Sequence, residues 1–331
     1  MKNEWKKWVT LLNLLFLLCV GLLSGCKKEI KAAPLKITVN SWIGFAPLFL
    51  AQEKGFFAKH GTALEIINVE DAGARKATMI AKQVDGYASS VDNFPIDSTM
   101  GVSGKIVMCF DESHGGDGIV AKKSIKTIAD LKGKKVAFQP GFPGHFLLLH
   151  VLKKNGLSQK DIVEIDMDSD KAGAAFAAGH LDAAVTWEPW LSKAEAMADG
   201  HKLITSDQLP GLIVDTLVFR DEVLVERGEE VKGVMKAWFE ALDYWQKNPE
   251  EANQIMAKAS KLSVEDFKAM TSGVKYFDYK RNVEYFGEKT AQGDIYKYFD
   301  AAGDYWLEIG LIKNKSKAAE KIDQSFVAKL Y

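Results

Sequence analysis

The feature that most constrains the fold is a repeated switch between strand-like and helix-like hydrophobic periods from Leu35 onward. Residues 35–40 alternate apolar and polar side chains as a strand does, and the apolar residues after Pro47 recur at helical spacing as far as Gly61. The exchange repeats, with strands expected at 64–69 and 85–90 and helices at 72–82 and 93–100. Such alternation is typical of a mostly parallel sheet covered by helices, so the sequence predicts an α/β fold.

A second unit of similar plan follows two expected strands, 105–110 and 118–123, which flank a polar turn at 111–118. Its strands are expected at 135–138, 162–167, 182–187 and 202–205, and its helices at 143–155, 170–178 and 189–198. Residues 212–219 return to strand character. Everything beyond Asp221 is predicted to be helical, and 231–252 has the clearest amphipathic period.

Two such units predict two α/β lobes joined by a hinge, with a helical C-terminal tail. Crossings between the lobes are expected near residues 118–123 and 209–214, which makes the second lobe an insertion into the first. We expect lobe 1 to comprise 35–118 and 213–331, and lobe 2 to comprise 119–212.

The N-terminus has the features of a secretory signal. Lys2, Lys6 and Lys7 precede an apolar run at 8–23, which is too short for a confident membrane span. Leu23-Ser24-Gly25-Cys26 resembles the bacterial lipobox, at which the Cys thiol is acylated and the preceding bond is cut. The alternative is a plain signal anchor. We expect a signal peptide at 1–25, a lipidated Cys26, a tether at 26–34, and a mature chain held on the outer face of the cell membrane.

Cysteine content and charge exclude several classes of protein. Cys19 leaves with the signal and Cys26 carries lipid, so Cys109 remains alone, as an expected buried strand thiol that cannot form an internal disulfide. Loss of the signal removes three Lys and one Glu, which leaves a net charge of −3 and no electrostatic footprint for nucleic acid. The chain has no G-x-S-x-G elbow, H-E-x-x-H motif or Cys/His metal spacing, and no cofactor is expected.

In open α/β sheets, ligands bind outside the carboxyl ends of the strands. The residues at those ends here are small residues, hydroxyls, a few acids and aromatics, a mixture that suits a compact polar ligand stacked against rings. The candidate ligand-binding residues are Ser41, Trp42, Gly44, Arg75, Ser89, Ser90, Asp92, His114, Gly141, Phe142, Gly144, His145, Trp187, Glu188 and Asp215.

The corner at 136–150 is the most distinctive of these ends. Gly141 and Gly144 allow close approach of the backbone to a ligand, and Pro143 occupies the first position of an expected helix. The next free N–H groups, of Gly144, His145 and Phe146, would form a seat for an anion or a carbonyl group at the positive end of the helix dipole. The alternative is an ordinary turn between a strand and a helix, with no role in binding.

Several candidates have a second interpretation. His145 also fits a surface or capping residue, and the glycines after His114 fit a tight turn or hinge better than a phosphate loop. Trp42 and Trp187 fit a core edge as well as a stacking surface. Glu188 fits a helix N-terminal charge or an amine partner, and Asp92 fits a helix N-cap or a ligand-binding acid.

Nearly all of the mature chain resembles the substrate-binding proteins of ABC importers for nitrate, sulfonate and taurine, a group that includes thiamine-precursor binders. Several of the candidate residues lie in the stretches that carry this resemblance. The stretches are WIGFAPLFLAQEKGFFAKHG (42–61), DGYASSVDN (85–93), GGDGIVAKKSIKTIADLKGKKVAF (115–138), GHFLLLHVLKKNGLSQKDI (144–162), AAFAAGHLDAAVTWEPW (174–190) and AWFEALDYWQKNPEEA (237–252). The resemblance implies a type 2 periplasmic-binding-protein fold that closes on one solute. It also implies pocket positions at Ser41, Trp42, Gly44, Ser89, Ser90, Asp92, 141–145, Trp187 and Glu188.

The leading hypothesis is therefore a monomeric, lipid-anchored solute receptor that delivers its ligand to a membrane permease driven by an ATPase. The acids Asp92, Glu188 and Asp215, with Arg75 nearby, favour a taurine-like zwitterion or aliphatic sulfonate over nitrate. The loop GFPGH lacks the Ser-rich form common among sulfonate binders, which leaves an aromatic N-heterocycle such as a thiamine pyrimidine precursor as an alternative. A pyrimidine-forming enzyme of similar fold relies on a Cys-rich iron-binding run that this chain lacks. A sensing module without transport is a third possibility.

Overall fold

The structure is a computed structural model that describes residues 33–288 and 291–331. The expected signal peptide, Cys26 and all but the last residues of the tether lie outside the described residues. Residues Pro34–Tyr331 form one compact unit. No helix in the described part of the chain is long and apolar enough to cross a bilayer.

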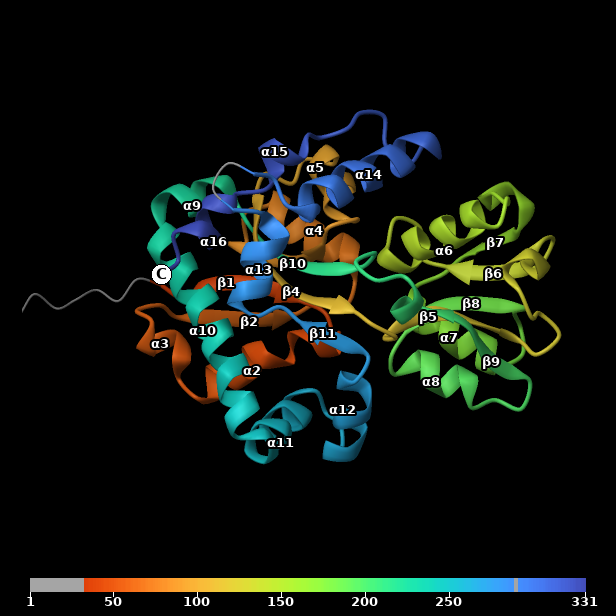
Figure 1. Ribbon diagram of the computed structural model, residues 1–331, viewed down its shortest axis with the longest axis horizontal. Helices are drawn as coiled ribbons and strands as arrows, with labels where there is room; N and C mark the ends of the chain where they lie inside the picture. Colours follow the sequence, from red (N-terminus) through yellow and green to blue (C-terminus); the bar gives the residue numbers. More distant parts are fainter. Residues whose placement is uncertain (1–32, 289–290) are drawn as a thin grey trace, which may run out of the picture. The chain divides into compact units, whose positions relative to one another are not determined.

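Six strands form the first sheet, in the order β11-β4-β10-β3-β1-β2 (Figure 1). Their bounds are β1 Leu35–Val39, β2 Leu64–Asn68, β3 Gly86–Ser90, β4 Lys105–Ser113, β10 Val214–Phe219 and β11 Val274–Tyr276. β1 pairs in parallel with β2 and β3, whereas β10 pairs antiparallel with both β3 and β4. β10 and β11 therefore complete a sheet begun by the first four strands.

Five strands form the second sheet, in the order β7-β6-β8-β5-β9. Their bounds are β5 Asp117–Lys122, β6 Lys135–Phe138, β7 Val163–Asp166, β8 Ala183–Trp187 and β9 Gly200–Thr205. β5 pairs along its length with β8 and β9, so the chain passes between the sheets at 114–116 rather than at the expected 118–123. It returns between Thr205 and Val214.

Helices pack around each sheet. Those that precede the second sheet, or follow β10, are η1 Ile43–Phe45, α2 Ala46–Glu53, α3 Phe56–Lys59, α4 Ala72–Ile80, α5 Phe94–Thr99, α9 Asp221–Glu226, α10 Gly228–Lys247, α11 Pro249–Ala259, α12 Val264–Thr271, α13 Tyr279–Phe286, α14 Asp294–Glu308, α15 Ala318–Lys321 and α16 Gln324–Ala328. Those between β5 and β10 are η2 Ile128–Leu131, α6 Pro143–Lys154, η3 Gln159–Asp161, α7 Ser169–Ala177, α8 Trp190–Glu195 and η4 Ser206–Gln208. The predicted α/β class is confirmed.

Local chemistry explains where two of the expected helices end. The single helix expected at 47–61 is broken into α2 and α3 at Gly55, whose φ of 71° lies in the left-handed region that favours glycine. The amphipathic stretch at 231–252 is divided at Asn248, because Pro249 begins a new helix.

Two expectations about strands are wrong. The polar stretch 111–118 was expected as a turn, yet Asp111 to Ser113 extend β4 and Asp117 begins β5. Their polar side chains find partners there, since Ser113 Oγ bonds Ser206 Oγ at 2.8 Å and Glu112 pairs with Arg281. The chain beyond Asp221 is not entirely helical either, because β11 pairs with the edge of β4.

One helix of the C-terminal region also packs with the second group of elements. Ala302 and Trp306 of α14 share a buried apolar cluster with Phe146 and Leu147 of α6. Trp306 Nε1 donates a 2.6 Å hydrogen bond to the backbone oxygen of Asp92, which follows β3. The C-terminal helices thus contribute to the contacts between the two groups of elements.

Candidate functional site

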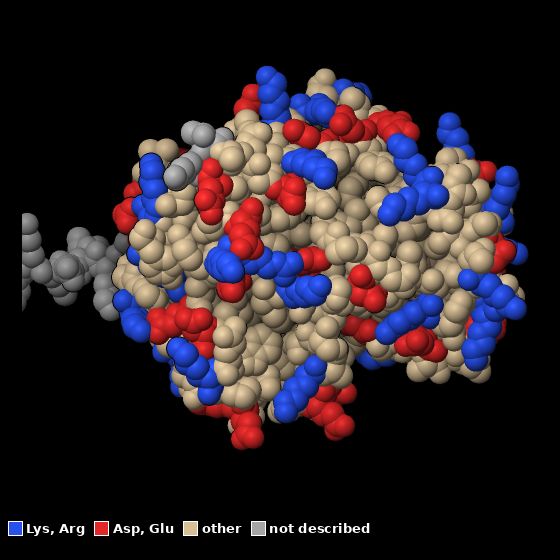
Figure 2. All heavy atoms as spheres, in the orientation of Figure 1, with Lys and Arg blue, Asp and Glu red and all other residues tan. Residues whose placement is uncertain are grey.

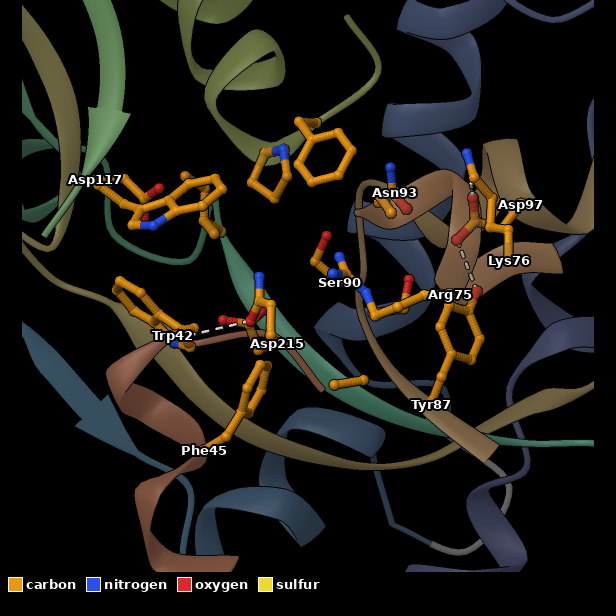
Figure 3. Close-up of a pocket in the computed structure, with 18 residues that line it drawn as sticks. Trp42, Phe45, Arg75, Lys76, Tyr87, Ser90, Asn93, Asp97, Asp117 and Asp215 are labelled. Carbon is orange, nitrogen blue, oxygen red and sulfur yellow. Dashed lines mark hydrogen bonds and ion pairs between the residues drawn. The ribbon is translucent and has the colours of Figure 1, made fainter. Parts of the chain in front are cut away.

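A cavity is lined by residues from the facing strand ends of both sheets. It encloses about 620 Å³, counted to its open mouth (Figure 3). Trp42 follows β1, Ser89 and Ser90 end β3, and Asp215 begins β10. From the second sheet come Asp117 at the start of β5 and Trp187 at the end of β8, and Phe142 lies at the entry to α6. The site therefore lies outside strand carboxyl ends, where the alternating sequence predicts it.

Seven of the fifteen candidate residues line this cavity: Trp42, Arg75, Ser89, Ser90, Phe142, Trp187 and Asp215. The remaining lining residues are outside the fifteen candidates, although Pro143 lies within the implied pocket positions 141–145: Asn40, Phe45, Ala72, Lys76, Tyr87, Ala88, Asn93, Asp97, Asp117, Pro143 and Ile213. A signal existed for some of them. Ala72, Arg75 and Lys76 are spaced i, i+3 and i+4 on α4 and share one helix face.

Three candidates near the first sheet lie outside the cavity lining. Ser41 is exposed and donates to Glu70. Gly44 lies so close to Asp111 and the Trp42 indole nitrogen that any side chain there would collide with both. The Asp92 side chain is buried beside the pocket, and neither of its carboxyl oxygens has a hydrogen-bond partner among the residues described.

Of the three N–H groups expected to form an anion seat at the start of α6, that of Phe146 is used within the helix. The Phe146 N–H donates to the Phe142 oxygen within the helix, and Gly144 packs against Val185. His145 points inward, where its Nδ1 accepts from the Gly141 N–H at 3.0 Å, its Nε2 lies 3.0 Å from Gln159 Oε1, and its ring stacks on Phe138. His145 thus positions the loop that carries Phe142 but does not line the cavity.

The last two candidates, His114 and Glu188, line a separate hollow with Lys202 and Met270. Glu188 accepts hydrogen bonds from Ser192 Oγ at 2.6 Å and Ser192 N at 3.1 Å, and it forms an ion pair with Lys202. These bonds fix the start of α8, so Glu188 acts as the helix N-terminal charge that was its alternative interpretation.

One end of the cavity is basic. Arg75 is 7% exposed, and its Nη1 donates to the backbone oxygens of Val69 and Glu70 at 2.7 and 2.8 Å. No hydrogen bond from its Nε or Nη2 is found within the described chain. Lys76 pairs with Asp97 at 3.3 Å, and Asp97 also accepts from the Tyr87 hydroxyl at 2.7 Å. Within the lining these two cations share the Asp97 carboxylate, and the carboxylates of Glu70 and Asp71 also act on Arg75 from outside it.

The other end of the cavity is acidic. Asp117 and Asp215 line it, and Asp111 lies beneath them as the cross-strand partner of Asp215. Burial raises the pKa of Asp117 to about 6, and burial also raises the pKa of Asp111 to about 7 and that of Asp215 well above its ordinary value. Mutual repulsion among these carboxyl groups adds to the effect. A cation placed among them would relieve both the repulsion and the desolvation.

Aromatic rings and unpaired hydroxyls complete the lining. Trp42 and Phe45 project into the cavity from one side, and Trp187 lines it from the second sheet (Figure 3). The hydroxyl oxygens of Ser89 and Ser90 are buried without a hydrogen-bond partner in the described structure. Since buried polar atoms normally have partners, these two hydroxyls are suited to a ligand. No cluster of His, Cys, Asp or Glu with the form of a metal site occurs among the described residues.

The face of the molecule shown in Figure 2 has no single sign of charge. Lys and Arg side chains alternate with Asp and Glu side chains across the face shown in Figure 2. The strong charge separation is therefore inside the cavity, between Arg75 and Lys76 at one end and Asp117 and Asp215 at the other. This arrangement can hold the two charged ends of one small molecule.

Comparison with known proteins agrees with this geometry. The chain is 25% identical over 259 residues to the taurine-binding periplasmic protein of Escherichia coli K12, which covers 74% of this chain and 79% of that protein. Its fold is similar to that of the periplasmic aliphatic sulphonate binding protein SsuA from Escherichia coli, with a TM-score of 0.73, 20% identity, and coverage of 88% and 92% of the two chains. The periplasmic nitrate-binding protein NrtA from Synechocystis gives a TM-score of 0.70 with 18% identity, over 90% and 88% of the chains.

All three of these proteins are named as binding proteins, and the structural likenesses confirm the expected fold of periplasmic binding proteins. A sequence profile of the NMT1-like family matches residues 28–260, which is well over half of the chain. The chain therefore belongs to the NMT1-like family.

Proposed function

We propose that this protein is the solute-binding component of an ABC importer and that its ligand is a small amino sulfonate or a related zwitterion. The observation that carries the proposal is the charge separation inside the cavity. Arg75, with the unpaired hydroxyls of Ser89 and Ser90, is suited to a sulfonate, and Asp117 with Asp215 is suited to an ammonium group. Charged groups in an enclosed cavity interact more strongly than in water, so each end contributes to affinity.

The lining also favours one second ligand class, a cationic or amino-substituted aromatic N-heterocycle. Trp42, Phe45 and Trp187 offer ring faces to a planar ligand, and the carboxyl groups next to them can accept N–H donors from its ring or amino substituents. Such a ligand would leave Arg75 without a partner unless it also carried an anionic or carbonyl group. The basic end of the cavity therefore favours the zwitterion over the N-heterocycle as the ligand.

We further propose that the two sheets with their helices are lobes that close on the solute, with bounds near the expected 35–118 and 213–331 for lobe 1 and 119–212 for lobe 2, except that lobe 2 begins with β5 at Asp117. Contacts that join them would hold the closed state. Asn93 Nδ2 donates to the Gly141 oxygen, and the Trp306 contact with α6 is of the same kind. A solute that touches both lobes selects the closed state because only that state offers both sets of contacts.

Export and anchoring are part of the proposal. Acylation of Cys26 would hold the mature chain on the outer face of the membrane, where it would present solute to the permease and its ATPase as a monomer. We propose binding without catalysis. Mass spectrometry of the chain purified from membranes tests the anchor: a lipid-modified N-terminal Cys26 is expected, and an unmodified, uncleaved N-terminus would contradict it.

Isothermal titration calorimetry of the full chain in detergent tests the ligand. The panel is taurine, ethanesulfonate, nitrate and 4-aminopyrimidine, chosen to present both charges, the sulfonate alone, a small anion, and the ring alone. Taurine is expected to bind more tightly than ethanesulfonate by at least tenfold, since it adds a charged hydrogen bond at the acidic end. Preference for ethanesulfonate or nitrate over taurine would contradict the zwitterion, and tightest binding of 4-aminopyrimidine would favour the second class.

A further inference from the structure

Two carboxyl groups face each other at the floor of the cavity. Asp111 on β4 and Asp215 on β10 are partners in adjacent antiparallel strands. Asp215 lines the cavity, whereas Asp111 is fully buried and is not part of the lining. Trp42 Nε1 donates to Asp111 Oδ1 at 3.0 Å, and Asp111 Oδ2 has no hydrogen-bond partner among the residues described. Gly44 packs tightly against this contact.

The groups around the pair do not neutralise it. Asp117 approaches from β5 and Asp92 from the end of β3, while Cys109 and Tyr276 are the uncharged titratable neighbours on β4 and β11. The nearby cations are Arg75 on α4 and Arg281 on α13.

Both of these cations have partners of their own. Arg281 forms an ion pair with Glu112, and Arg75 Nη1 donates to two backbone oxygens. Two carboxyl groups buried side by side cannot both ionise at neutral pH without a cation between them. Burial accordingly raises the pKa of Asp111 to about 7.

We propose that Asp111 and Asp215 share one proton while the cavity is empty, and that a solute with an ammonium group releases this proton to the solvent when it binds. Binding adds the positive charge of the ammonium group and removes one proton from the carboxyl pair. The net charge at the floor of the cavity is therefore the same before and after binding. Asp111 is then a specificity-determining residue that never touches the solute. The inference rests on the proposed function, because it requires a solute with a cationic end.

Calorimetry with two probes tests the exchange. The full chain is titrated at pH 7 with taurine and with isethionate, in which a hydroxyl replaces the ammonium group, in phosphate and in Tris buffer. The difference in heat between buffers gives the number of protons released. Taurine is expected to release close to one proton and isethionate none, and the dissociation constant of taurine is expected to fall about tenfold from pH 6 to pH 7, as release of one proton requires.

The variant Asp111→Asn keeps an acceptor for the Trp42 indole but removes the repulsion that Asp111 exerts on Asp215, so taurine is expected to release fewer protons from it than from the natural chain. Asp130→Asn, an exposed carboxylate that caps η2, serves as the control and should behave as the natural chain. Taurine binding without proton release would overturn the inference and leave the proposed function intact.

A second measurement needs no ligand. The infrared spectrum of the ligand-free chain at pH 7 is expected to show a protonated carboxyl band that Asp111→Asn weakens and Asp130→Asn leaves unchanged. Absence of that band from the natural chain would overturn the inference even if no solute in the panel binds, whereas a present band with no binding would overturn the proposed ligand class alone.

Discussion

Replacing Asp117 by Asn should stabilise the ligand-free protein at high pH. The Asp117 side chain lies in the cavity lining, 5% exposed, and burial raises its pKa from 3.8 to about 6. A group with a raised pKa in the folded state stabilises folding below its unfolded pKa, and that stability is lost as the pH rises through the folded pKa. At pH 8 the ionised carboxylate therefore destabilises the fold relative to a neutral side chain of the same shape, by about 3 kcal/mol.

Asparagine has that neutral shape, so the effect of the variant should depend on pH. At pH 8 the free energy of unfolding of Asp117→Asn is expected to exceed that of the natural chain by about 3 kcal/mol, and at pH 4 the difference should shrink to less than about 1 kcal/mol. Urea denaturation of the full chain in detergent, without added solute, measures both values. The same variant should lose affinity for taurine, because the neutral amide no longer pairs with an ammonium group.

A matched control has the opposite sign. Asp161 caps η3 through Ser158, and these hydrogen bonds lower its pKa, so Asp161→Asn should lose stability at pH 8 rather than gain it. If Asp117→Asn were no more stable than the natural chain at pH 8, the reasoning that this carboxylate is held at an energetic cost for its ligand would be refuted. Equal gains at pH 4 and pH 8 would refute the assignment of the gain to ionisation.

Three further substitutions test other contacts. Arg75→Lys keeps the positive charge but loses the guanidinium group, which can bond two backbone oxygens and a ligand at once. Taurine affinity measured by calorimetry should therefore fall about 10- to 100-fold. Unchanged affinity would show that Arg75 does not bind the ligand. Trp306→Phe leaves the backbone oxygen of Asp92 without its hydrogen bond. The free energy of unfolding should fall by about 1–3 kcal/mol, and taurine affinity should fall as well. The control Trp245→Phe loses a hydrogen bond to Asn253 and should lower stability alone. Gly44→Ala should displace Trp42 and Asp111 and weaken taurine binding at least tenfold, and a variant that binds normally would show that this packing is not required.

The alternation of strand and helix periods predicted the fold class and the strand ends that meet at the cavity. Periodicity is local, so it could not predict that Asp111 and Glu112 belong to a strand, because their strand is stabilised by partners more than a hundred residues away, at Asp215 and Arg281. Buried carboxyl groups at a strand end have the composition of a turn. That is why 111–118 was taken for a turn.

The site was predicted in part for a related reason. Trp42, after β1, and Ser90, at the end of β3, could be found from their place at a strand end. Lys76 on α4, Tyr87 within β3 and Asp97 on α5 lie inside elements and reach the cavity only through tertiary packing. The glycines and histidine of 141–145 were placed in the right loop, but their roles depend on side-chain direction. His145 turns into the core because Gly141, Gln159 and Phe138 provide its partners.

The position of β10 between β3 and β4 has a consequence for biogenesis. β3 and β4 each need β10 as a neighbour, yet at least 100 residues separate them from it in the sequence, so both strands are synthesised with an unsatisfied edge. The second sheet is contiguous in sequence and can assemble on its own beforehand. We therefore expect the second sheet to form before the first sheet is complete, and the nascent chain to depend on protection from aggregation until residue 219 has been synthesised.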